Sequence, residues 1–182
     1  VSIGNGLQPS LRGSSAIATP SLQSLSLYSS GAGAAPSQVQ TALRAMYPAA
    51  PTELLRTQAA AGTNIVAEIA PIAATSAPPA GWPTGFGTAL WPIAKLISAG
   101  YPVEIATADL GGWDEHNAMG SATDPTGNQY KLIAGLDAAL GAFFDFIGGA
   151  AARTTVVITT EFGRRIAING SGGTDHGRGM VM

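Results

Sequence analysis

The sequence contains no cysteine and few charged residues. The absence of thiols excludes a cysteine nucleophile, cysteine-ligated zinc and disulfides, and it leaves the redox compartment open. Charged residues make up 11% of the 182 positions, well below the roughly 25% of typical soluble domains. The nine basic residues are scattered apart from the pair Arg164–Arg165, so no basic stripe indicates a nucleic-acid partner.

The sequence also lacks the run of about 18 apolar residues that marks a transmembrane helix, so we predict no membrane span. Its first residues, VSIGNGLQPSLRG, have no basic start followed by an apolar block and do not resemble a signal peptide. The chain begins on a strand-like VSI and stops on the apolar segment 180–182. We therefore expect an internal fragment of a larger domain.

Apolar side chains at spacings of three and four, bounded by proline and glycine, predict four helices. These are expected over about 37–47, 51–71, 87–98 and 125–147. Gly62 should weaken the second helix and Pro71 should end or kink it. Gly100 is the expected C-cap of the third helix. Asp124 is the expected N-cap of the fourth, which stops at Gly148–Gly149.

Two apolar, β-branched segments flank the fourth predicted helix. They are 103–108 (VEIATA) and 154–160 (TTVVITT), and the second is too apolar for an exposed edge strand. A strand–helix–strand unit is a parallel crossover, and ligands bind beyond the carboxyl ends of such strands. The pattern predicts an α/β fold with a parallel sheet, in which 86–182 form the βαβ core and 1–85 an irregular and helical region of the same domain.

Three polar motifs follow residue 110: GGWDEH (111–116), TEFGRR (160–165) and GGTDHG (172–177). The chain has two histidines, and they lie in the first and third motifs. Imidazole and carboxylate groups are costly to bury without a partner, and a divalent ion is a common partner. Because the first two motifs follow predicted parallel strands, all three are expected at one rim. Together they favour a hard-to-borderline metal bound through oxygen and nitrogen.

The individual motifs leave alternatives open. Taken alone, GGWDEH favours a turn in which Asp114 and His116 bond loop amides while Trp113 packs. The most site-like element is Asp175–His176 in its glycine-flanked turn.

The motif TEFGRR holds two catalytic candidates. Glu161 is either a metal ligand or general base, or a salt-bridge partner of Arg164 or Arg165. The guanidinium of Arg164 could hold a phosphate or sulfate group bidentately, although an arginine beside a glutamate is usually structural. Phe162 is expected in the core.

The order GGWDEH, long helix, TTVVITTEFGRR, NGSGGTDHG resembles a bacterial family of exported proteins, domain of unknown function 1501. That family is similar in fold to the alkaline phosphatase and sulfatase superfamily. The segments LRG (11–13) and GTALWPIAKLISAG (87–100) fit its pattern loosely. The resemblance implies a doubly wound α/β domain, incomplete at both ends, in a periplasmic or secreted protein.

The resemblance also implies hydrolysis of a small phosphate or sulfate ester with one or two divalent ions. Zinc is the expected ion, with manganese or calcium as alternatives. Carried over by position, Asp114, His116 and His176 are ligands, and Asp175 and Glu161 are ligands or their neighbours. Glu161 and Phe162 stand where the superfamily usually has Asp-His, which puts a two-metal site in doubt.

Three hypotheses follow for the function. The first is a fragment of a metal-dependent ester hydrolase, inactive by itself because the superfamily's nucleophile would lie upstream of Val1. The second is an exported binding or assembly protein that keeps the fold and a metal without turnover. The third is a structural fragment without metal, in which His116 and His176 bond backbone groups. A fragment would expose sheet edges and apolar surface, so we expect self-association.

Overall fold

The computed structural model describes residues 2–3, 9–13, 18–19, 36–73 and 77–180. The chain divides into two compact units, Val1–Pro79 with Ala89–Ala108 and Ala80–Thr88 with Asp109–Met182. Most of the region predicted to be irregular, before residue 36, lies outside the described residues. The prediction of a single domain stays a prediction.

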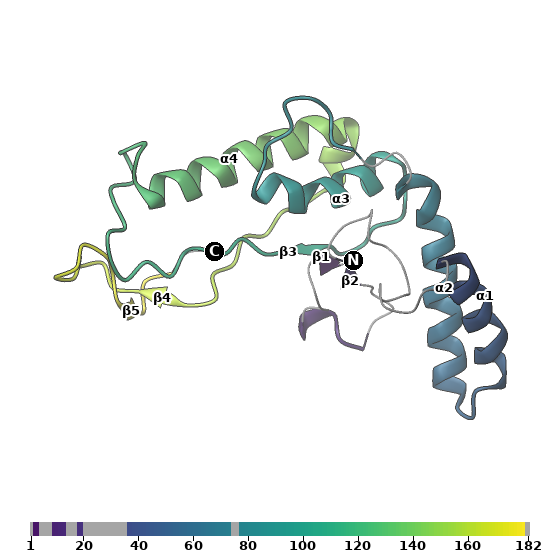
Figure 1. The fold of residues 1–182 in the computed structure, drawn as a ribbon. Helices are drawn as coiled ribbons and strands as arrows, with labels where there is room; N and C mark the ends of the chain where they lie inside the picture. Colours follow the sequence, from purple (N-terminus) through teal and green to yellow (C-terminus); the bar gives the residue numbers. More distant parts are fainter. Residues whose placement is uncertain (1, 4–8, 14–17, 20–35, 74–76, 181–182) are drawn as a thin grey trace. The chain divides into compact units, whose positions relative to one another are not determined.

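A helical hairpin dominates the first unit. Helix α1 (Pro36–Met46) and helix α2 (Glu53–Ala73) lie side by side, joined through a 3-10 turn, Tyr47–Ala49 (Figure 1). The Arg44 guanidinium donates to the carbonyl of Thr63 at 3.0 Å and ties the two helices together. Both predicted helices are confirmed. Helix α2 continues two residues past Pro71, because a proline in the last turn removes only one hydrogen bond near the helix end.

Helix α3 (Phe86–Ser98) confirms the third predicted helix. Its side chains at Leu90, Ile93 and Ala94 are buried as the periodicity predicts. Gly100 has a φ of +75°, and its N–H bonds to the carbonyl of Ile97, as expected for a C-cap. The buried centre of the first unit is formed by two fully enclosed side chains and four partly buried neighbours: Leu96, Ile69, Ile65, Ile72, Tyr101 and Val103.

Three very short strands run parallel in the first unit. Strand β1 (Ser2–Ile3) pairs with β2 (Ala18–Thr19) on one side and with β3 (Thr107–Ala108) on the other. The predicted strand over 103–108 therefore forms only at its last two residues. The doubly wound sheet stays a prediction.

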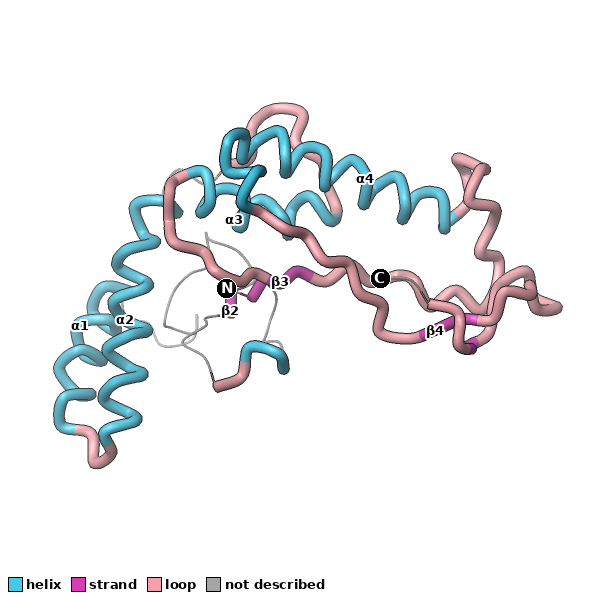
Figure 2. Tube along the Cα trace, turned by 180° about the vertical axis from the view of Figure 1, so that it is seen from behind, coloured by secondary structure: helices cyan, strands magenta, loops and turns pink. Residues whose placement is uncertain are grey.

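The predicted strand over 154–160 is wrong, and so is the parallel pairing expected between it and 103–108. The segment is not part of a strand, and the Val156, Val157 and Ile158 side chains are 40%, 67% and 48% exposed. A strand exists only where a second segment supplies the matching N–H and C=O groups. No described segment does so here, and Figure 2 shows the region after α4 mostly as loop.

Helix α4 (Asn128–Ile147) is the long helix of the second unit. It ends at Gly148, as predicted, with a φ of +52°. The expected N-cap is wrong, because Gly127 occupies that position. The Asp124 carboxylate instead accepts hydrogen bonds from the N–H and hydroxyl of Thr126, at 2.9 and 2.8 Å, so a local turn uses it before the helix begins.

The stretch Asn128–Arg153 is long and apolar enough, by length and composition, to cross a membrane. Such a helix is weak evidence for a span, and Lys131, Asp137 and Asp145 carry charges along it. Ala139, Phe143 and Ile147 form its buried positions, and the T-shaped contact of Phe146 with Trp82 at 5.7 Å anchors it within its own unit. The prediction of no membrane span stays a prediction.

Candidate metal centre

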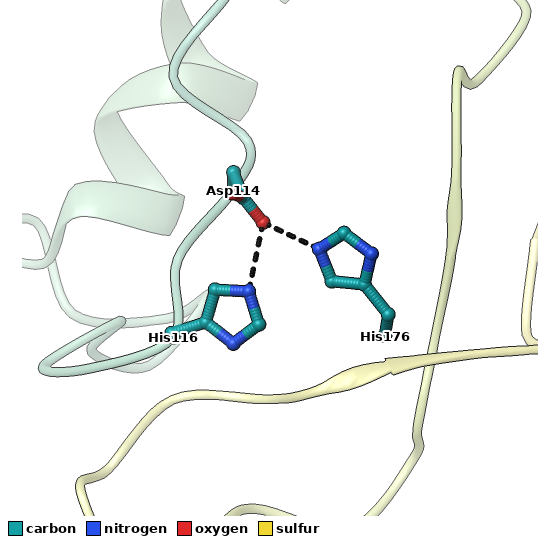
Figure 3. Close-up of side chains that lie close together, drawn as sticks. All are labelled: Asp114, His116 and His176. Carbon is teal, nitrogen blue, oxygen red and sulfur yellow. Dashed lines mark hydrogen bonds and ion pairs between the residues drawn. The ribbon is translucent and has the colours of Figure 1, made fainter.

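One carboxylate oxygen faces both histidines of the chain. Asp114 Oδ1 lies 3.1 Å from His116 Nε2 and 2.9 Å from His176 Nε2 (Figure 3). The three candidate ligand atoms all lie within 4.8 Å of one another. All three side chains are exposed, so an ion could reach them from solvent. Asp114 and His116 come from a turn in which the Glu115 N–H bonds to the Trp113 carbonyl at 2.9 Å.

The third ligand arrives through a short antiparallel pair in the same unit. Strand β4 (Gly163–Arg164) pairs with β5 (His176–Gly177), and Arg164 lies directly opposite His176. Directly opposite residues of an antiparallel pair project to the same face. The pairing therefore puts the cation of the second motif and the imidazole of the third motif beside Asp114.

Arg164 ties the first and third motifs together. Its Nη2 donates to Asp114 Oδ1 at 2.7 Å and to the Trp113 carbonyl at 2.8 Å. Its Nη1 donates to the Thr174 carbonyl, to the Thr174 hydroxyl at 3.3 Å and to the Glu115 carbonyl at 3.4 Å. The guanidinium is thus used by acceptors of the chain itself, and its ion pair is with Asp114 rather than with Glu161.

Three aromatic rings stack on one another at the candidate site. The imidazoles of His116 and His176 lie 4.9 Å apart at 11°, and Phe162 lies 4.8 Å from His176 at 6°. The Arg164 guanidinium carbon sits 5.0 Å from the centre of the Phe162 ring. The prediction that Phe162 belongs to the core is wrong. The ring is only half-buried, because stacking against a histidine and a cation takes the place of core contacts.

Asp175 touches the other nitrogen of His116. Its Oδ1 lies 3.4 Å from His116 Nδ1 and accepts a hydrogen bond from Asn169 Nδ2 at 3.0 Å. A carboxylate on the distal nitrogen of a metal-binding histidine is a common arrangement, since it orients the ring. Asp175 therefore contacts a candidate ligand and does not itself belong to the cluster of three.

Glycines allow the main chains of the three motifs to come into direct contact. A Cβ on Gly173 would overlap the main chain of His116, and one on Gly177 would lie 2.6 Å from the Arg165 nitrogen. Backbone hydrogen bonds join the same segments: the Thr174 N–H donates to the Glu115 carbonyl at 3.1 Å, and the Arg165 N–H donates to the Asp175 carbonyl at 2.8 Å. Glycine is required at these positions because any side chain would separate the segments.

The charges of the site stabilise its carboxylates. The hydrogen bond with His176 lowers the pKa of Asp114, and the nearby His116, His176 and Arg164 lower it further. The hydrogen bond from Asn169, followed by that with His116, lowers the pKa of Asp175. Both groups are therefore ionised at neutral pH, as ligands and orienting groups must be.

The structure brings together five of the six predicted site residues. Asp114, His116 and His176 form the cluster, while Arg164 and Asp175 contact it. Glu161 is exposed, and no hydrogen bond or ion pair joins it to the described residues.

Sequence reasoning missed Asn169, whose side chain bonds both His116 and Asp175. The signal was present, since Asn before Gly in NGSGG favours a turn closed by the Asn side chain.

The family described as "Protein of unknown function (DUF1501)" matches residues 24–182, so the chain belongs to this family. No curated protein and no solved structure matches the chain.

Proposed function

We propose that the chain binds a divalent metal ion through Asp114, His116 and His176. The observation that carries this proposal is the meeting of two imidazole Nε2 atoms at one carboxylate oxygen, at 3.1 and 2.9 Å. Neighbouring ligand atoms of a tetrahedral zinc site lie about 3.3 Å apart, as follows from bond lengths of roughly 2.0–2.1 Å. The separations of Asp114 Oδ1 from the two imidazole nitrogens are thus close to that of ligands around one ion, and all three ligand atoms lie within 4.8 Å of one another.

The donor set favours zinc over the alternatives. Two imidazole nitrogens and one carboxylate oxygen suit a borderline ion, whereas calcium takes about six to eight oxygen ligands. Three protein ligands would leave a fourth position for water or substrate, as in catalytic zinc sites. Manganese is the second candidate, because it accepts the same nitrogen and oxygen donors.

We propose further that the protein of which this site is a part hydrolyses phosphate or sulfate esters, in keeping with the superfamily resemblance. A bound divalent ion polarises the ester oxygen and stabilises the attacking and leaving groups. The chain's own residues position the proposed ligands. Arg164 holds Asp114 in place through an ion pair of 2.7 Å, and Asp175 orients the ring of His116. Periplasmic or secreted localisation and a doubly wound sheet belong to the same proposal.

A second candidate function is an exported binding or assembly protein without turnover. It is favoured by the positions of Glu161 and Phe162. Glu161 is exposed, and no hydrogen bond or ion pair among the described residues joins it to the cluster, while Phe162 places an apolar ring against His176. An apolar ring binds no ion, so this face of His176 offers no second metal site.

Metal content by mass spectrometry tests the proposal, with wild type beside His116→Ala, His176→Ala and the exposed helix variant Asp137→Ala as control. We expect zinc in equal amount to protein in the wild type and the control, and none in either histidine variant. Metal-free protein after zinc exposure would contradict the proposal and favour hydrogen-bonded structural histidines. Stoichiometric zinc without hydrolysis of aryl phosphate or sulfate by the whole protein would favour the binding protein.

A further inference from the structure

We infer that Asn169 is a positioning residue that sets the ring of His116 for metal binding, an inference that rests on the metal site proposed above. Asn169 Nδ2 donates to the backbone carbonyl of His116 at 2.9 Å and to Asp175 Oδ1 at 3.0 Å. The same Asp175 oxygen faces His116 Nδ1 at 3.4 Å. Asn169 therefore holds both the main chain of His116 and the carboxylate beside its ring.

The oxygen end of the Asn169 amide is used as fully as the nitrogen end. Asn169 Oδ1 accepts hydrogen bonds from the N–H groups of Ser171 at 2.9 Å and Gly173 at 3.1 Å. Its own N–H donates to the Gly173 carbonyl at 2.8 Å. The pattern needs two donors and one twofold acceptor on a short side chain, which only asparagine supplies. Aspartate lacks the donors, and glutamine places them one methylene further out.

The consequence for His116 concerns the orientation of its ring. A carboxylate oxygen faces each ring nitrogen of the metal-free chain, Asp175 Oδ1 at 3.4 Å from Nδ1 and Asp114 Oδ1 at 3.1 Å from Nε2. An ion on Nε2 would use the lone pair of that nitrogen, so the ring hydrogen would lie on Nδ1, where Asp175 can accept it. Asn169, through Asp175, thus holds the ring with Nε2 toward the proposed ion. His176 is held differently, by stacking between the rings of His116 and Phe162.

The substitution Asn169→Asp separates this role from the turn that Asn169 also closes. It keeps the oxygen that accepts from Ser171 and Gly173, removes the amide donors and places a second carboxylate beside Asp175. We expect zinc Kd, measured by competition with a chelator, to rise roughly 10–100-fold, as for other residues that orient metal ligands. The control is Asn117→Asp, which adds the same charge at an exposed neighbour of His116 and should bind within a few-fold of wild type.

A second readout does not need metal. In NMR spectra of the metal-free chain, proton NOEs between the rings of His116 and His176, whose centroids lie 4.9 Å apart, should be present in the wild type. They should be weak or absent in Asn169→Asp. Should Asn169→Asp fail to fold, Asp175→Asn removes the carboxylate and leaves the turn; the same two changes are expected from it.

The two proposals fail in different ways. A wild-type chain that binds no zinc overturns the metal site, while the NOEs between the His116 and His176 rings still test the role of Asn169. A folded Asn169→Asp or Asp175→Asn variant that keeps both the wild-type zinc affinity and the wild-type NOEs between the two rings overturns the positioning role, whatever the wild-type affinity is.

Discussion

The helices of the first unit and the polar turns of the second are held together by different forces. Leu96 and Ile69 are fully enclosed among apolar neighbours, as in an ordinary core. In the turns, cohesion comes from Arg164 and Asn169, whose side chains bond backbone carbonyls, amides and carboxylates of segments distant in sequence. In the turn region, therefore, the residues that hold the segments together are also those that contact the candidate site.

That difference predicts different tolerance to substitution. Apolar burial is non-directional and scales with area, so a core accepts similar side chains at similar positions. Hydrogen bonds demand a donor and an acceptor at the right angle and distance. Core substitutions should therefore lower stability with little effect on metal affinity, whereas substitutions in the turns should alter metal affinity directly.

The largest effect on stability is expected from Leu96→Ala. Removing a fully buried leucine side chain costs roughly 2–5 kcal/mol, and urea-induced unfolding followed by circular dichroism measures it. The control Leu54→Ala changes a side chain that is 72% exposed and should stay within about 0.5 kcal/mol of wild type. The folded Leu96→Ala protein should bind zinc as the wild type does. Weaker binding would break the separation between the two regions.

Gly173→Ala should act on the turn region instead. A Cβ at this position overlaps the His116 backbone, so the first and third motifs must move apart. We expect a loss of about 1–3 kcal/mol in thermal unfolding, as for overpacking, together with weaker zinc binding. Gly170→Ala is the matched control, because nothing lies within 4 Å of its Cβ. Equal affinity in the two variants would show that the close approach is dispensable.

The stability that the turn region contributes should also fall in acid. The pKa values of Asp114 and Asp175 are lowered in the folded chain, through hydrogen bonds with His176 and from Asn169 respectively. The stability that they contribute is therefore fully present above the ordinary aspartate pKa of about 3.9 and is lost as pH falls through the lowered values. Unfolding by urea between about pH 6 and pH 2.5 should show this loss.

The variant Asp175→Asn should flatten that acid-side fall, since one of the two shifted carboxylates is gone. Burial raises the pKa of Glu115, so its contribution has the opposite sign. If the free energy of unfolding of the wild type falls no more steeply in acid than that of Asp175→Asn, these contacts are not the cause of the fall.

The smallest expected effect is a gain in stability. Gly135 lies in the middle of α4, is exposed and has open space where a Cβ would be. Gly135→Ala should raise the free energy of unfolding by roughly 0.5–1 kcal/mol, since glycine loses more backbone entropy in a helix. Gly112→Ala provides the contrast in the turn region, because its φ of +95° strains any side chain. A gain in both variants would remove the distinction between helix and turn.

Local pattern alone was sufficient for the helices. Apolar spacing with bounding Pro36 and Gly148 placed α1 and the end of α4, because helical hydrogen bonds join residues four apart. Glycine-flanked Asp114, His116 and His176 were likewise recognisable from their motifs. The cap of α4 was missed by three residues, since Asp124 closes a turn of its own first.

Only the tertiary structure decided the rest. The segment 154–160 has every local mark of a strand, yet a strand needs a partner that composition does not reveal, and no described segment pairs with it. Phe162 looks like a core residue until His176 is found stacked on it. Asn169 contacts His116, 53 residues earlier in the chain. Motifs determine which groups are available for chemistry, whereas the long-range approach of backbone segments determines which of those groups meet.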